Sequence, residues 1–141
     1  MEWTDLENKA VIITGGAAGL GLAVAKGFVE VGANVMIADF SEEAGQNAAT
    51  EASDAGRGEA RFTRCDVTQK ADVDQMIHST LDAFGTVDAL INNAGINVPR
   101  LLVDPAGKEE LTEEIWDKVF AVNVKGQFLC AQAAALSLIH I

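Results

Sequence analysis

The stretch T-G-G-A-A-G-L-G, residues 14–21, follows an apolar, β-branched run at residues 10–13 and opens a helical pattern. In that pattern Leu20, Val24 and Phe28 fall on one face, as in an amphipathic helix. A strand that passes through glycines into a helix leaves the first-turn N–H groups free at the positive end of the helix dipole. Because glycine has no side chain, a pyrophosphate can approach the backbone there. The stretch therefore predicts an anion site between a strand and a helix.

The glycine spacing by itself leaves an alternative open. Gly15, Gly19 and Gly21 follow the order G-x-x-x-G-x-G, whereas the common dinucleotide fingerprint is G-x-G-x-x-G. The chain has 13 glycines among its 141 residues, so a glycine-rich turn in an unrelated α/β protein also fits these three positions.

Three further apolar runs end in polar residues that suit a nucleotide. The run at residues 33–38 ends at Asp39, near the distance expected for a carboxylate that binds a cofactor ribose. A third run ends at Cys65, Asp66 and Val67, and a fourth leads into residues 91–95, the stretch I-N-N-A-G. The second and third runs are each separated from the next by a helical pattern, which predicts right-handed crossovers and a parallel sheet covered on both faces.

In this order, the glycine motif, Asp39, Asp66-Val67, the N-N-A-G of residues 92–95 and the N-V-K-G of residues 123–126 resemble the short-chain dehydrogenase/reductase family. The resemblance runs from about Lys9 to about Ala135. It implies a Rossmann-type, doubly wound parallel α/β sheet in which the strands present are ordered 3-2-1-4. It also implies that residues 1–135 are the NAD-binding half of a C-terminally truncated domain. Residues 136–141 do not continue the family pattern, and we interpret them as an anomalous tail.

Composition limits the other functions. The net charge of −11 argues against binding to nucleic acid, which requires clustered Lys and Arg. We find no segment of membrane-spanning length, and residues 1–5 are acidic, unlike a signal peptide. Cys65 and Cys130 lie in apolar surroundings without metal-ligand spacing, so we expect two core residues of a reduced, cytoplasmic protein and no metal site.

The expected strands cover about residues 9–14, 34–39, 60–65 and 87–92, and the expected helices cover about 20–31, 42–55 and 71–84, with a last one from about residue 112. Ser41 and Thr68 are the expected N-caps of the second and third helices, because a hydroxyl there can accept from a free N–H group.

The resemblance assigns the phosphate and ribose contacts. Gly15, Gly19 and Gly21 would hold the pyrophosphate, with Leu20 packing beneath it and supplying a backbone N–H group. Asp39, followed by Phe40, would accept hydrogen bonds from the adenosine ribose hydroxyls; a solvated strand-end carboxylate is the alternative for Asp39. The glycine loop carries no basic residue to bind an additional phosphate, so we expect NAD rather than NADP as the cofactor.

The remaining cofactor contacts lie after the third and fourth strands. In the family, Asp66 and Val67 contact the adenine ring, and Asn93, Ala94 and Gly95 let the nicotinamide ribose come close. For Asp66 the alternative is an aspartate that organises the helix entry. For Asn92 the alternative to a cofactor contact is a purely structural role.

The resemblance gives one catalytic residue. Asn123 stands in mid-helix, which is unfavourable for asparagine. In the family this residue belongs to the catalytic tetrad at a local helix kink, whereas a hydrogen-bonded core asparagine is the alternative. The family's serine and Tyr-x-x-x-Lys pair have no counterpart here, and the chain contains no tyrosine. We therefore expect residues 1–141 alone to catalyse no hydride transfer.

The loop at residues 96–111 resembles that of the family's sorbitol-6-phosphate 2-dehydrogenases, which implies oxidation of a polyol or polyol phosphate with NAD. Arg100 is then a possible contact for a substrate phosphate. A 3-oxoacyl-carrier-protein reductase is the alternative within the family, and a non-catalytic NAD-binding sensor or scaffold is the alternative outside enzymes. The family also implies a homo-oligomer, either a dimer or a tetramer.

Overall fold

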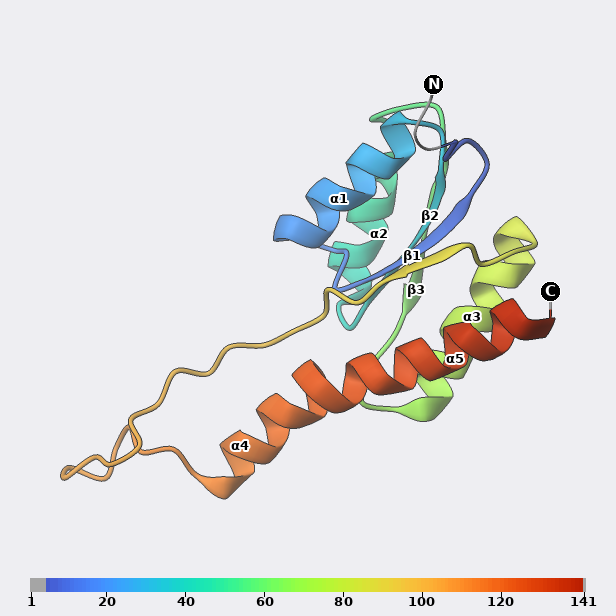
Figure 1. The fold of residues 1–141 in the computed structure, drawn as a ribbon. Helices are drawn as coiled ribbons and strands as arrows, with labels where there is room; N and C mark the ends of the chain where they lie inside the picture. The colour runs from blue at the N-terminus through green and yellow to red at the C-terminus, as the bar shows by residue number, and fades with distance from the viewer. Residues whose placement is uncertain (1–4, 141) are drawn as a thin grey trace.

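A computed structural model describes residues 5–140, with the side chain of residue 140 left aside. Most of the acidic stretch at residues 1–5 therefore lies outside the described residues. Figure 1 shows one parallel sheet with helices on both faces. The strands have the spatial order β3-β2-β1-β4, as the family resemblance implies. They are β1 (Ala10–Thr14), β2 (Asn34–Asp39), β3 (Ala60–Arg64) and β4 (Ala89–Ile91).

Burial explains why the first two strands dominate the sheet. Every residue of β1 is buried, and so are the four central residues of β2, because helices cover both faces. The register places Thr14 beside Ala38, and Asp39 beside Arg64. The carboxyl ends of the strands therefore meet at one edge of the sheet, where the glycine loop also begins.

The helices form two layers around the sheet (Figure 1). Two separate apolar clusters match these layers, one under α1 and α2 and the other under α3 and α5. The helices are α1 (Gly19–Glu30), α2 (Glu42–Ser53), α3 (Lys70–Phe84), α4 (Glu113–Phe120), the π-helix η1 (Ala121–Lys125) and α5 (Gly126–His140). The segment between β4 and α4 extends away from the sheet (Figure 1).

Local details differ from the sequence prediction at the helix starts. Thr68 is not the N-cap of α3; Gln69 holds that position, and the Thr68 hydroxyl donates instead to Asp66 at 2.7 Å. Ser41 is the N-cap residue of α2, but its side chain makes no capping hydrogen bond. Thr112 caps α4 by accepting from the Ile115 N–H group at 3.2 Å.

The last helical segments run as one continuous helix. Glu113–Ile139 spans 27 residues and includes a window of mean hydropathy 1.2, so by length and composition it is apolar enough to cross a membrane. The prediction that no segment reaches this length is therefore wrong, although core helices of soluble proteins meet the same criterion. α5 continues past Ala135 to His140, and the separate status of residues 136–141 stays a prediction.

Candidate cofactor site

A cavity of about 570 Å³ lies at the carboxyl ends of the strands. Most of its lining comes from the segments that the sequence analysis selected. The predicted residues that line it are Gly15, Asp39, Phe40, Asp66, Val67, Ala94 and Gly95, and they are joined by Cys65, Thr68, Ile96, Lys118, Ala121 and Val122. The cavity thus brings together the loop after β1 and the ends of β2, β3 and β4.

The glycine loop is built for close backbone approach. Gly15 has a φ of +65°, and a Cβ atom there would lie 2.8 Å from the Ala94 Cα atom. A Cβ atom on Gly21 would lie 2.2 Å from the Gly15 carbonyl oxygen. Ala18, the N-cap residue of α1, makes no side-chain capping hydrogen bond, so no capping side chain occupies the start of this helix. These features fit a pyrophosphate bound at the helix N-terminus.

Leu20 has a different environment from the one expected. Its side chain is 80% exposed rather than packed beneath the loop, and it does not line the cavity. Only its backbone N–H group, in the first turn of α1, fits the predicted contact with a phosphate.

Asp39 fixes the glycine loop relative to the end of β2. Its Oδ2 atom accepts a hydrogen bond from the Ala17 N–H group at 3.1 Å, and its Oδ1 atom accepts one from the Ser41 N–H group at 3.1 Å. Each carboxylate oxygen can accept more than one hydrogen bond, so both keep capacity for ribose hydroxyls. The strand-end carboxylate is therefore held in place at the wall of the cavity.

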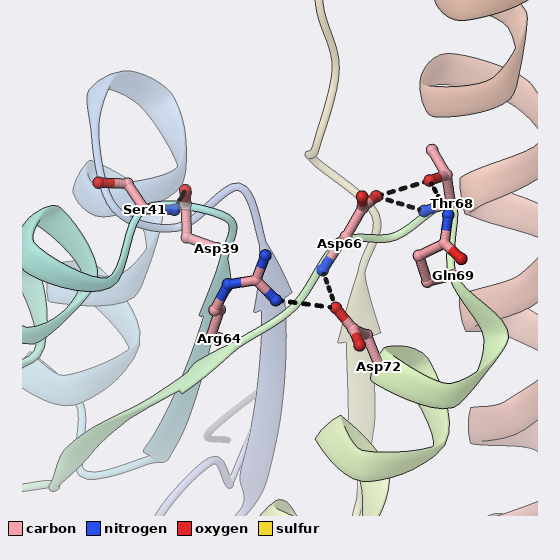
Figure 2. A network of polar contacts seen from close by, with 7 residues as sticks. All are labelled: Asp39, Ser41, Arg64, Asp66, Thr68, Gln69 and Asp72. Atoms are coloured by element: carbon pink, nitrogen blue, oxygen red, sulfur yellow. Dashed lines mark hydrogen bonds and ion pairs between the residues drawn. The ribbon is translucent and has the colours of Figure 1, made fainter.

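Asp66 fills the helix-entry role that was the alternative for it, and its contact with the adenine ring stays a prediction. Its Oδ1 atom accepts from the N–H group of Thr68 at 2.9 Å and from the hydroxyl of the same residue at 2.7 Å, which organises the entry to α3. Asp66 also lines the cavity. Its backbone N–H group donates to Asp72, as Figure 2 shows. Asp72 was not among the site residues predicted from the sequence.

Thr14 and Asn93 connect the glycine loop to the end of β4. The Thr14 hydroxyl oxygen is buried and accepts from the N–H groups of Asn93 and Ala94, each at 3.1 Å. The Asn93 amide donates in turn to the carbonyl oxygens of Thr14 at 3.1 Å and Gly15 at 3.0 Å. The structure therefore gives Asn93 a structural function, and its contact with the cofactor stays a prediction. Asn92 donates to the Gln127 carbonyl oxygen at the longer distance of 3.5 Å.

Asn123 lies in the π-helix η1, which confirms a helix irregularity at this position. Its side-chain amide donates to the Ile96 carbonyl oxygen and accepts from the Ile96 N–H group, both at 2.8 Å. π-Helical turns are rare and are found frequently at functional sites. Gly126 follows η1 directly, and a Cβ atom on it would lie 2.7 Å from the Val67 Cγ2 atom. The absent side chain lets this helix approach the cavity wall.

Lys118 adds a positive charge to the site and was not among the residues predicted from the sequence. It lines the cavity together with Ala121 and Val122, residues three and four positions further along the same helix. Lys118 could have been predicted from this helical spacing, because the large apolar residues of the same helix lie on another face.

Arg100 lies outside the lining of the cavity. Its guanidinium donates to the Pro99 carbonyl oxygen at 2.7 Å and lies 3.7 Å from a Glu109 carboxylate oxygen. Nearby, Asp104 closes the loop by accepting hydrogen bonds from the N–H groups of Glu109, Ala106 and Lys108, which lower its pKa. The structure thus shows the loop as an ordered turn, without placing Arg100 at the site.

Cys65 and Cys130 are free and buried, as predicted. Burial raises the pKa of the Cys65 thiol to about 12 and that of the Cys130 thiol to about 11, so both are protonated at neutral pH. Within residues 5–140, no group of three His, Cys, Asp or Glu side chains is placed to hold a metal ion.

The model of the short chain dehydrogenase family matches residues 9–140. The chain belongs to this family. It is 34% identical over 144 aligned residues to a sorbitol-6-phosphate 2-dehydrogenase of Klebsiella pneumoniae, covering 97% of this chain and 49% of that protein. It is 42% identical over 134 residues to the 2,5-dichloro-2,5-cyclohexadiene-1,4-diol dehydrogenase LinX of Sphingobium indicum, covering 95% and 51%.

A solved structure of this family has the same fold as this chain. A crystal structure of a short chain dehydrogenase from Mycobacterium smegmatis superimposes with a TM-score of 0.88 at 31% identity, covering 96% of this chain and 55% of the other. The chain therefore spans about half the length of these short-chain dehydrogenases. The family and the Rossmann-type fold that the sequence predicted are both confirmed.

Proposed function

We propose that this chain forms the cofactor-binding half of a short-chain dehydrogenase that passes a hydride between NAD and a polyol or polyol phosphate. The observation that carries the proposal is the cavity at the strand ends, with Asp39 fixed beside the glycine loop. Bound there, the nicotinamide would supply the chemistry of hydride transfer. The residues of this chain would bind and orient the cofactor.

The pyrophosphate would lie against Gly15, Gly19 and Gly21 at the start of α1. Side chains at two of these positions would collide with the backbone, as the short Cβ distances at Gly15 and Gly21 show. Gly19 has open space around its Cβ position and a φ of +55°, so its conformation, rather than its surroundings, favours glycine. The residues present therefore fit a dinucleotide.

Asp39 supports NAD over NADP. A 2′-phosphate would bring negative charge next to this carboxylate, and like charges placed together in a binding site cost several kcal/mol. No Lys or Arg stands in the glycine loop to compensate. Arg64, which the β-sheet register places opposite Asp39, is paired with Asp72 at 3.2 Å.

The polyol class rests on the relative that acts on sorbitol 6-phosphate and on the loop at residues 96–111. A contact between Arg100 and a substrate phosphate stays part of this proposal, and it would require Arg100 to exchange its Glu109 partner for the phosphate. A second candidate is a non-catalytic NAD-binding sensor or scaffold. The cavity and the glycine loop would serve such a protein equally well, because both are features of cofactor binding.

We also propose that the chain assembles as a homo-oligomer. Trp116, Phe120, Val124 and Phe128 follow each other at four-residue intervals and are 45–57% exposed. The rings of Trp116 and Phe120 stack with their centroids 4.6 Å apart. Exposed apolar stripes of this kind are typical of protein interfaces. For the compartment we propose the cytoplasm, in which the free thiols of Cys65 and Cys130 would stay reduced.

Calorimetric titration of the chain with NAD, NADP and ADP-ribose tests cofactor binding. We expect measurable binding of NAD and ADP-ribose, weaker binding of NADP, and a smaller difference between NAD and NADP in Asp39→Ala. Asp82→Ala, which removes an exposed carboxylate from α3, is the matched control. Failure of NAD and ADP-ribose to bind, or a preference for NADP, would contradict the proposal. An assay with sorbitol 6-phosphate separates the two candidates only in a protein that includes the family's Tyr-x-x-x-Lys pair.

A further inference from the structure

Asp72, in the first turn of α3, connects two segments that border the cofactor cavity. Its Oδ2 atom accepts from the Asp66 N–H group at 2.9 Å and from the Arg64 guanidinium at 3.2 Å. Figure 2 shows the Asp72 carboxylate between these two donors. The charge-assisted contact to Arg64 and the backbone contact to Asp66 thus converge on one oxygen atom.

Arg64 also contacts Phe40, which lies on another wall of the cavity. Its guanidinium carbon lies 4.9 Å from the centroid of the Phe40 ring, in a cation–π arrangement. Phe40 lines the cavity and is 64% exposed, so core packing does little to fix its ring. Arg64 does not itself appear among the described residues that line the cavity. It therefore contacts Phe40 without occupying the space meant for a ligand.

We propose that Asp72 is a positioning residue for the adenosine end of the cofactor. Through Arg64 it holds the Phe40 ring, and through the Asp66 N–H group it holds the adjacent wall. This inference rests on the proposed function and deepens it. The same arrangement makes Asp72 a specificity determinant, because it engages the arginine that the strand register places opposite Asp39. An arginine released there is available to a 2′-phosphate.

Asp72→Asn isolates the charge. The amide keeps an oxygen that can accept from the Asp66 N–H group, but it loses the ionic attraction to Arg64. An exposed ion pair and an exposed cation–π contact each have modest energies, so we expect the affinity for ADP-ribose to fall about threefold to tenfold. We expect 2′-phospho-ADP-ribose to lose less affinity, so that discrimination between the two ligands narrows. Asp72→Ala, which loses both contacts, should weaken ADP-ribose binding further than Asp72→Asn.

Asp74→Asn is the matched control, because Asp74 lies on the same helix and its carboxylate pairs only with Lys70 among the described side chains, at 2.8 Å. Its affinities for both ligands should equal those of the unsubstituted chain. Arg64→Ala provides the second variant, and the effect of Asp72→Asn should nearly vanish in that background. A purely structural role would lower the unfolding midpoint while leaving the ratio of the two affinities unchanged.

The outcomes separate the inference from the function on which it rests. If the unsubstituted chain binds ADP-ribose and Asp72→Asn behaves like Asp74→Asn, the inference is overturned and the proposed function stands. An equal effect of Asp72→Asn with and without Arg64 also overturns it. If the unsubstituted chain binds neither ligand, the proposed function fails and the inference with it.

Discussion

The side chain of Asn123 forms two hydrogen bonds with the backbone of a single residue, Ile96. Its amide nitrogen donates to the carbonyl oxygen and its oxygen accepts from the N–H group, both at 2.8 Å. Ile96 follows directly after the A-G of residues 94–95, and η1 is the π-helical turn that carries Asn123. This pair therefore joins the segment after β4 to the long C-terminal helix beside the cavity.

Asn123→Ala should destabilise the chain because it leaves both backbone groups of Ile96 without their side-chain partner. Unsatisfied, partly buried polar groups cost about 1–3 kcal/mol. Chemical denaturation followed by circular dichroism measures the loss. Asn47→Ala, at an exposed position of α2, is the control and should not lower the free energy of unfolding. Equal stability of the two variants would show that the Ile96 contacts contribute nothing.

Two glycines of α1 should respond oppositely to alanine. Gly21→Ala places a Cβ atom 2.2 Å from the Gly15 carbonyl oxygen, so the loop must shift, and we expect a loss of about 1–3 kcal/mol together with weaker ADP-ribose binding. Gly27→Ala meets no atom within 4 Å at an exposed helical position and should gain about 0.5–1 kcal/mol. Thermal unfolding of both variants checks the signs. A stabilised Gly21→Ala would contradict the described loop geometry.

The buried thiols should make the chain less stable in alkaline solution. Burial raises the pKa of Cys65 to about 12 and of Cys130 to about 11, whereas unfolded thiols ionise near pH 9. Above pH 9 the unfolded chain therefore binds fewer protons than the folded chain, and stability falls as pH rises toward these values. Denaturation between pH 8 and pH 10 should show this decline, and Cys65→Ala should reduce it. Rapid alkylation of both thiols in the folded chain at pH 8 would contradict their protonated, buried state.

The apolar stripe on the C-terminal helix should control assembly. Phe128→Glu places a charge on this surface, and loss of a central interface residue typically costs about 2 kcal/mol or more, roughly thirtyfold in affinity. Light scattering at several concentrations should show smaller particles for this variant. Leu102→Glu, at an exposed apolar position of the loop before α4, is the control and should leave the mass unchanged. A homo-oligomer unaffected by Phe128→Glu would place the interface elsewhere.

The sequence by itself determined the alternation of strands and helices, the glycine loop and the position of Asp39 at the end of β2. These features follow from local periodicity and from the rule that the carboxyl ends of parallel strands meet at one edge. The start of the last helix near residue 112 was also expected, and the structure adds that Thr112 caps it by accepting from the Ile115 N–H group. The family's residue pattern added the spatial order of the strands and the irregular helix at Asn123.

Only the tertiary structure decided which partner each polar side chain takes. Thr68 was expected to cap α3 but donates to Asp66, and Asn93 was expected to contact the cofactor but also holds Thr14 and Gly15, about 78 residues earlier in the chain. Asp72 reads in the sequence as an ordinary acidic residue at a helix start. Its role depends on where β3 ends relative to α3. Such pairings depend on distances between segments that fold together, and no local pattern in the chain records them.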